Sequence, residues 1–420
     1  MQSKRRLTPL VAVFTVVFGM VSTTAPLFGA SKEKVLNRFN GRDGESPGGS
    51  VIFDSAGNLY GTTVHGGASG VGNVYELSPQ ANGSWKEKVL HTFDGADGDY
   101  PESSLIFDSA GNLYGTAAVG GAYGDGTVFE LSPNADGSWK LTTLYSFGGK
   151  SDDGGEPVAS LIFDVAGNLY GTTSGGGAYR GDGTVFELSP AGGSWTETVL
   201  YSFNGKDGES PESSLIFDAA GNLYGTTYSG GGFSAGVVFE LSPGANGKWT
   251  ETVLHRFAGQ SGAGPYAALI SDASGNLYGT TVGGGTYGVG TVFELSLATH
   301  GTWKEKVLHN FQNNGKDGIR PYGGVIFDKA GSLFGTTLNG GSSAGGCAQL
   351  ACGTAFELSP GTNGNWTEKI LYRFIFGTDG LEPSAGLVFG PTGNLYGTTG
   401  TGGSGCGSHV HCGTVFEITP

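Results

Sequence analysis

A hexapeptide, Gly-Asn-Leu-Tyr-Gly-Thr, returns seven times along the sequence with small changes. A period of more than 50 residues is typical of propeller blades or solenoid coils, in which each repeat buries its apolar faces against its neighbours. A single array is therefore a better expectation for the 420 residues than several unrelated domains. The copies begin at Gly57, Gly111, Gly167, Gly221, Gly275, Gly331 and Gly393.

Each unit contains four short runs, which we name A, B, C and D in chain order. They are rich in β-branched and aromatic residues and are bounded by Gly, Pro, Asn or Asp, as strands are. In the fourth unit they cover 213–218, 222–227, 236–242 and 249–257. The first glycine of the hexapeptide is expected to make a tight A–B hairpin with a positive φ angle. The sequence therefore predicts an all-β fold, a seven-bladed β-propeller with four antiparallel strands per blade.

The two ends of the chain favour a closed ring. Residues 32–39 match the D run at 86–93, whereas the chain finishes with a C run at 413–418 and no D run follows it. We expect the N-terminal strand to complete the last blade and so to remove an open sheet edge. A parallel β-helix would have no use for this complementarity and is disfavoured.

Composition excludes several protein classes. The 81 glycines have no Gly-X-Y register, and 37% hydrophobic residues provide a core, so neither collagen nor a disordered chain is expected. A net charge of −15 opposes binding to nucleic acid or to anionic membranes. Lys4, Arg5 and Arg6 precede an apolar run at 10–20, which is typical of a secretory signal peptide. We expect residues 1–30 to be that signal and residues 31–420 to form an exported, soluble and monomeric propeller without membrane insertion.

The repeated unit also resembles a known family. The motifs that carry the resemblance are Gly-Asn-Leu-Tyr-Gly-Thr-Thr, a Gly-Gly stretch, Gly-Thr-Val-Phe-Glu-Leu-Ser-Pro and Trp-Thr-Glu-Thr-Val-Leu-Tyr-Ser-Phe. Over about residues 32–420 the chain is similar to the tandem repeat of the bacterial GloVer family, a group of choice-of-anchor exported proteins. The resemblance implies export and a propeller-like array, and it implies no particular activity.

The B–C and D–A loops should share one face of the disc. They vary in length and composition, so this face is the expected binding face. Four B–C loops carry an aromatic residue at one position, which could form a platform for stacking sugar rings or could pack against the adjacent blade. Because large aromatic residues tend to be buried, packing is the favoured interpretation. The four residues are Tyr123, Tyr179, Phe233 and Tyr287.

One glutamate recurs in run C of every unit. A catalytic group is usually needed once, in one special environment, whereas a residue present in every blade most simply stabilises the blade. We therefore expect each carboxylate to be hydrogen-bonded within its blade or to its neighbour. These residues are Glu76, Glu130, Glu187, Glu240, Glu294, Glu357 and Glu417.

The D–A loops carry Asp-Gly-x-x-Pro in six of the seven units, which is first of all a turn signal. Calcium is the functional alternative, because Asp94, Asp97 and Asp99 with Glu102 place several oxygen ligands in one short loop. The EF-hand spacing is not met, so the turn interpretation leads. No other cofactor is predicted.

All four cysteines lie in insertions of the B–C loops of units six and seven. In an exported protein the natural interpretation is two local disulfides, Cys347–Cys352 and Cys406–Cys412, although pairing between the two blades is also compatible with the sequence. A metal site formed by Cys406, His409, His411 and Cys412, with His65 from the neighbouring first unit, is the alternative. It does not match a common zinc spacing.

The expected function is non-catalytic binding of a glycan or a cell-surface partner through the B–C and D–A loop face. A hydrolase or lyase acting on polysaccharides is the first alternative, and it would need two nearby carboxylates, one with a raised pKa. A structural envelope or matrix protein is the second. Unique acids in a central pocket would favour the enzyme, an aromatic floor the glycan binder, and a featureless Gly-lined face the structural role.

Overall fold

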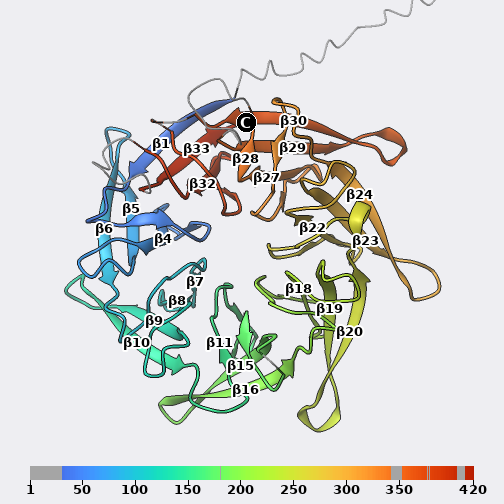
Figure 1. The fold of residues 1–420 in the computed structure, drawn as a ribbon. Coiled ribbons are helices and arrows are strands. Elements are labelled where there is room, and N and C mark those ends of the chain that lie inside the picture. Colours follow the sequence, from blue (N-terminus) through green and yellow to red (C-terminus); the bar gives the residue numbers. More distant parts are fainter. Residues whose placement is uncertain (1–30, 180, 342–351, 376, 378, 404–411) are drawn as a thin grey trace, which may run out of the picture.

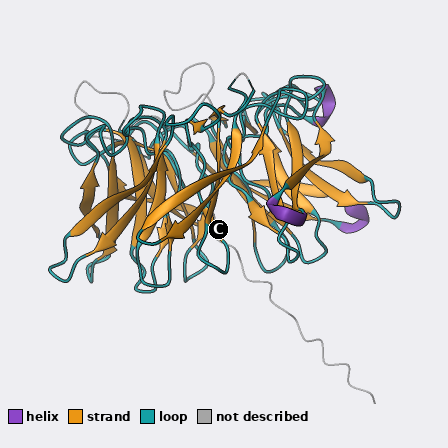
Figure 2. Ribbon diagram, turned by 90° about the horizontal axis from the view of Figure 1, so that it is seen from below, coloured by secondary structure: helices purple, strands orange, loops and turns teal. Residues whose placement is uncertain are grey.

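The computed structural model describes residues 31–179, 181–341, 352–375, 377, 379–403 and 412–420. Seven antiparallel blade sheets stand in a ring around an axis, as Figure 1 shows, and the loops gather at the two ends of the disc (Figure 2). Six sheets have four strands, and the first has a fifth because the short strand β2 joins it. This confirms the predicted seven-bladed β-propeller. The described residues contain no α-helix but three short 3₁₀ turns, η1 (Ala245–Gly247), η2 (Gly259–Ser261) and η3 (Thr362–Gly364). The predicted signal peptide lies outside the described residues.

Every blade is built from the same four strands. The innermost strands A are β3 (Ile52–Phe53), β7 (Ile106–Phe107), β12 (Ile162–Phe163), β17 (Ile216–Phe217), β21 (Ile270–Ser271), β26 (Ile326–Phe327) and β31 (Val388–Phe389). Strands B are β4 (Leu59–His65), β8 (Leu113–Ala117), β13 (Leu169–Thr173), β18 (Leu223–Thr227), β22 (Leu277–Thr281), β27 (Leu333–Thr337) and β32 (Leu395–Thr399). Strands C are β5 (Asn73–Pro79), β9 (Thr127–Pro133), β15 (Thr184–Ala191), β19 (Val237–Pro243), β23 (Thr291–Leu297), β29 (Thr354–Pro360) and β33 (Thr414–Thr419). The outer strands D are β6 (Trp85–Thr92), β10 (Trp139–Ser146), β16 (Ser194–Ser202), β20 (Trp249–Arg256), β24 (Trp303–Asn310), β30 (Trp366–Arg373) and, in the seventh blade, β1 (Lys32–Arg38).

The ring closes as the two chain ends predicted. Strand β1 pairs antiparallel with β33, with Lys32 opposite Thr419 and Arg38 opposite Thr414. The seventh blade therefore has the order β1-β33-β32-β31 (Figure 1). Because the first strand of the propeller covers the last one, the seventh sheet does not end in an unpaired strand C.

The hexapeptide is explained by the A–B hairpin and the core beneath it. Gly111 has a φ angle of 89°, which its lack of a side chain allows. Asp108 closes the turn, since its Oδ1 accepts hydrogen bonds from the backbone N–H groups of Ala110 and Asn112. A side chain at Gly115 would collide with the ring of Phe129, at 2.7 Å from its Cζ atom. The motif is therefore structural in every blade.

Strand A is shorter than the sequence predicted. The run 213–218 contains only the two-residue strand β17, and every other blade repeats this. The residues before it bond to their own strand B partly through side chains, for example Ser103 Oγ to the carbonyl of Thr116, and they also bond to the next blade. In the second blade, for example, the N–H of Ser104 donates to Oγ of Ser160, and Thr116 Oγ1 donates to the carbonyl of Ala159. The inner wall of the disc is thus held together across blades.

Short strand pairs join the D–A and B–C loops. β2 (Glu45–Pro47) pairs with β4, β11 (Gly154–Gly155) with β14 (Gly175–Gly176), and β25 (Gly318–Ile319) with β28 (Asn339–Gly340). The two kinds of loop therefore lie on one face, as expected.

Candidate functional site

A cavity of about 620 Å³ lies on the axis of the propeller and is lined by all seven blades. Its wall is formed by the residues that lead from each D–A loop into strand A, together with residues near the ends of the B strands such as Val64 and Thr401. Both sets lie toward the face that carries the B–C and D–A loops. A cavity of this volume is within the usual range for small-ligand sites.

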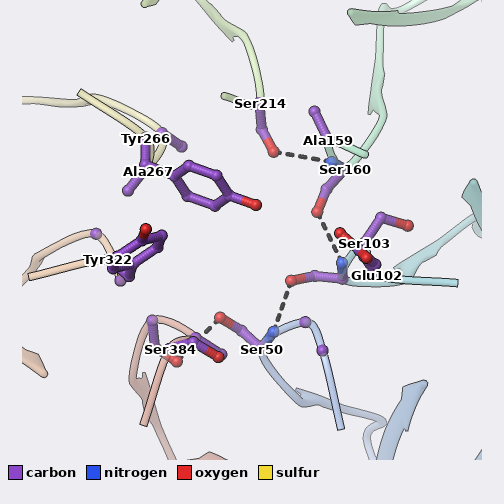
Figure 3. Close-up of a pocket in the computed structure, with 18 of the residues that line it drawn as sticks. Ser50, Glu102, Ser103, Ala159, Ser160, Ser214, Tyr266, Ala267, Tyr322 and Ser384 are labelled. Atoms are coloured by element: carbon purple, nitrogen blue, oxygen red, sulfur yellow. Dashed lines mark hydrogen bonds between the residues drawn. The ribbon is translucent and has the colours of Figure 1, made fainter. Parts of the chain in front are cut away.

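A ladder of serine side chains runs around one side of the cavity. The N–H of Ser50 donates to Oγ of Ser104 at 2.8 Å, that of Ser104 to Ser160 at 2.9 Å, and that of Ser160 to Ser214 at 3.0 Å (Figure 3). Ser50 Oγ in turn donates to the carbonyl of Gly386 at 2.9 Å. These hydroxyls satisfy backbone groups, and blades five to seven have alanine or glycine at the same position.

The residue directly after each D–A loop proline faces the cavity and differs between blades. Figure 3 shows Glu102 on one side of the cavity, with Tyr322 across from it and the hydroxyl of Tyr266 pointing inward. Glu212 lines the cavity from the fourth blade. The seven residues in blade order are Gly48, Glu102, Val158, Glu212, Tyr266, Tyr322 and Ser384.

The two glutamates have unusual electrostatic surroundings. Burial, and then the charges of Glu102 and Glu156, raise the pKa of Glu212 to about 7. Burial also raises the pKa of Glu102. Within the described chain, no group donates a hydrogen bond to either carboxylate. Their oxygens are therefore available to donors of a ligand that enters the cavity.

Two tyrosines, Tyr266 and Tyr322, form the opposite wall, and Tyr228 packs behind Tyr266. The rings of Tyr266 and Tyr322 lie 5.0 Å apart between centroids and are tilted by 55°, and the ring of Tyr228 meets Tyr266 edge-on at 6.3 Å. Burial is the main cause of the raised pKa of Tyr266, with Glu212 and Glu102 adding to it, so the phenol stays neutral and able to donate. The cavity thus combines acceptors on one side with an aromatic surface on the other.

The four aromatic residues of the B–C loops do not pack as we expected. Their exposed fractions are 63% for Tyr123, 53% for Tyr179, 69% for Phe233 and 54% for Tyr287. The packing interpretation was wrong, because more than half of each side chain is exposed and is not covered by the adjacent blade. In the second blade, Tyr123 lies over Gly149 of the following D–A loop.

The loop proposed for calcium directs its carboxylates to different tasks. Oδ1 of Asp94 accepts from the N–H of Ala96, Oδ2 of Asp97 lies 2.7 Å from Nε2 of His91, and Glu102 lines the cavity. Burial raises the pKa of Asp99, and the N–H of Tyr100 and the charge of His65 oppose this rise only in part. Among the described residues, the one group of three possible metal ligands lies elsewhere. Calcium at this loop stays a prediction that the geometry does not support.

The structure describes two of the four cysteines. Cys352 and Cys412 are both buried and disulfide-bonded. Cys347 and Cys406 lie outside the described residues, as do His409 and His411, so the two local pairings and the alternative metal site stay predictions. His65 is half-buried on β4, where its ring meets Tyr100 edge-on at 4.9 Å.

The glutamate of strand C has the structural role that we expected. It is half-buried and bonded within its blade, for example Glu130 with Ser132 Oγ at 2.6 Å and Glu240 with Ser242 Oγ at 2.8 Å. In the fifth blade Lys306 Nζ lies 4.0 Å from Glu294. These carboxylates are partners of the sheet and not of the cavity.

Sequence reasoning missed Glu212, Tyr266 and Tyr322, and it named Glu102 only as a calcium ligand. A signal was present. The proline before these positions recurs in all seven units, whereas the residue after it changes from unit to unit. A position that varies within an otherwise repeated unit lets each blade present a different side chain, so it is a candidate for function.

Comparisons with known proteins agree with this architecture. The chain is similar over 91% of its length, at 11% identity and a TM-score of 0.53, to the extracellular domain of a protein of B. thetaiotaomicron described as a one-component system, and it spans 40% of that structure. A protein of unknown function from Dyadobacter fermentans matches with 9% identity and a TM-score of 0.42, over 93% of this chain and 99% of that one. A Thermus thermophilus structure described as an oxidoreductase (glucose dehydrogenase) matches with 18% identity and a TM-score of 0.42, over 76% and 96%.

At 11% identity the likeness to the extracellular domain shows the fold alone. No curated protein matches the sequence. In the described part of the chain, no helix has the length and apolar character needed to cross a membrane. The model of the Gloeobacter/Verrucomicrobia repeat matches residues 16–216 and 140–348, which is most of the chain and covers six of the seven copies of the hexapeptide. The chain therefore belongs to the Gloeobacter/Verrucomicrobia repeat family.

Proposed function

We propose that the chain is an exported glycan-binding propeller that takes a sugar unit into its axial cavity. The observation that carries this proposal is the lining of that cavity, where Glu102 and Glu212 face the aromatic wall of Tyr266 and Tyr322. Sugars offer hydroxyl groups that donate to carboxylates, and their C–H faces stack on aromatic rings. The exposed aromatics of the B–C loops lie on the same face and supply stacking surface for the rest of a longer glycan.

Export supports this function but is itself part of the proposal. It rests on the apolar N-terminal segment and on the extracellular origin of the structure that matches at a TM-score of 0.53. The negative net charge is compatible with a neutral or amino-sugar ligand and opposes an acidic one.

A glycan array probed with the chain lacking residues 1–30 tests the proposal, followed by calorimetric titration of any sugar that binds. We expect the double variant Glu102→Gln and Glu212→Gln, and separately Tyr266→Ala, to weaken binding about tenfold or more, because each removes a contact worth about 1.4 kcal/mol. The matched control is Glu251→Gln, since burial also raises the pKa of Glu251 to about 7 but this residue lies outside the cavity wall. Binding that survives both cavity changes would overturn the assignment.

A glycoside-cleaving enzyme is the second candidate, and the raised pKa of Glu212 favours it. A carboxylic acid with a pKa of about 7 beside a second carboxylate is the arrangement that a general acid requires. Release of reducing ends from a bound glycan, lost in Glu212→Gln while binding persists, would decide for the enzyme. Binding without release decides for the glycan binder.

A further inference from the structure

A cluster of three potential metal ligands lies between the fifth and sixth blades. His309 comes from β24, Asp317 from the following D–A loop, and Glu368 from β30 of the next blade. The three ligand atoms lie within 4.8 Å of one another, with His309 Nε2 at 3.4 Å from Asp317 Oδ2 and at 3.7 Å from Glu368 Oε1. In the described chain this is the one such group.

Three buried polar atoms of this cluster have no hydrogen bond. Asp317 is only 6% exposed, and its Oδ1 atom is buried without a hydrogen bond. Nε2 of His309 and Oε1 of Glu368 are also buried without one. Oδ2 of Asp317 accepts from the N–H of Gln312, and the nearby Arg373 donates through Nη2 to the carbonyl of Lys316. Two carboxylates facing each other in a half-buried place need a proton or a cation between them.

The same three positions can be compared at the other six junctions, where a strand D, the D–A loop after it and the strand D of the next blade meet. In three of them a tyrosine replaces the histidine and donates to the loop aspartate, at 2.9 Å for Tyr145, 2.7 Å for Tyr201 and 2.6 Å for Tyr372. In the junction closed by β1, Asn37 donates to Glu87 at 3.0 Å. In each of these four junctions, the residue at the position of His309 therefore donates a hydrogen bond to a carboxylate.

Two junctions keep a histidine but lack one carboxylate. His91 contacts Asp97, and Leu141 stands where Glu368 stands in the sixth blade. His255 lies 3.9 Å from Glu305, and Ser261 stands where Asp317 stands. Of the seven junctions, the one between blades five and six alone has the imidazole and both carboxylates among its described residues.

We propose that His309, Asp317 and Glu368 bind a divalent transition-metal ion that cross-links the fifth and sixth blades. One imidazole nitrogen and two carboxylates are a donor set that Zn²⁺ accepts, and water would complete the coordination. The ligands come from two blades and the loop between them, so binding stabilises the folded ring and not the unfolded chain.

The experiment uses the chain lacking residues 1–30, treated with EDTA and dialysed, then titrated with Zn²⁺ by calorimetry at pH 7. We expect one equivalent to bind and the melting temperature to rise by roughly 3 °C when free Zn²⁺ is about 100 times the Kd. The variant His309→Tyr should lose this equivalent and still fold, because a tyrosine fills the same position in three other junctions.

A gain-of-binding variant separates the site from any other zinc ligands in the chain. Leu141→Glu supplies the missing carboxylate beside His91 and Asp97, so it should add a second equivalent, and Ser261→Asp should do the same beside His255 and Glu305. Unchanged zinc stoichiometry in His309→Tyr would overturn the proposal. The proposal would also be overturned if the wild type bound no zinc. A wild type that then lost stability with rising pH while Glu368→Gln did not would show that a shared proton holds the two carboxylates.

Discussion

Carboxylates of the A–B hairpins and of the axial cavity show opposite chemistry within one fold. Burial alone would raise the pKa of Asp108, but the N–H groups of Asn112 and Ala110 and the side chains of Asn112 and Tyr114 outweigh it and lower the pKa. Glu212 is buried without such donors, and its pKa rises to about 7. A hairpin carboxylate accepts hydrogen bonds from its own blade, whereas a cavity carboxylate has no such donors and can accept hydrogen bonds from a ligand.

Asp108→Ala should give the largest effect on stability. The hairpin would lose four hydrogen bonds to a charged acceptor, so we expect a loss of about 3 kcal/mol in the free energy of unfolding. Denaturant unfolding followed by tryptophan fluorescence measures it. Glu212→Ala is the matched cavity control and should cost little, because no described partner is left unpaired. Equal losses of unfolding free energy in the two variants would contradict the distinction between hairpin and cavity carboxylates.

The pH dependence of stability should separate the same two groups. Asp108, Asp164, Asp218 and Asp272 have lowered pKa values, so their contribution is present above the ordinary pKa near 3.8 and is lost as the pH falls below it. Glu212 has a raised pKa, so its contribution is present below the ordinary value of 4.5 and is lost as the pH rises through about 7.

The variant Glu212→Gln isolates the contribution of Glu212 to the pH dependence of stability. We expect it to be more stable than the wild type at pH 8 by roughly 1 kcal/mol, and equally stable at pH 4.5, because the amide mimics the protonated acid. Melting temperatures of both proteins across pH 4.5 to 8 provide the measurement. The variant will keep part of the pH dependence of the wild type, since burial also raises the pKa of Glu33, Glu251 and Glu305 to about 7. A slope unchanged in the variant would contradict a buried, unpaired Glu212.

The sequence predicts the ring well because each constraint is local and repeated. Gly111 needs a positive φ angle, Gly115 must leave room for Phe129, and the match between 32–39 and 86–93 defines which strand completes the seventh sheet. Either glycine could be misjudged in one unit, but the seven copies agree. The length of strand A was misjudged because its first residues bond to the adjacent blade, which a pattern within one unit does not show.

The candidate sites depend on contacts between units, so the sequence predicts them poorly. Glu102 and Tyr322 are 220 positions apart and line one cavity only because the ring brings blades two and six around one axis. His309 and Glu368 likewise meet because neighbouring D strands lie side by side, with contacts between β24 and β30. The exposure of Tyr123 was missed for another reason, since a general tendency of aromatics to be buried does not say whether a covering layer exists.

The smallest expected effect concerns the serine ladder. Its residues line the cavity wall, but their hydroxyls bond backbone groups and stabilise the fold. Ser160→Ala would remove the acceptor of the Ser104 N–H, so we expect a loss of about 1 kcal/mol in the free energy of unfolding. Ala268→Ser places a hydroxyl at the first position where the ladder stops, beside Ser214, and should restore at most the same amount. Neither change should alter glycan affinity, because these hydroxyls face backbone groups. A serine variant that weakened glycan binding at unchanged stability would show that these hydroxyls contact the ligand and do not only stabilise the fold.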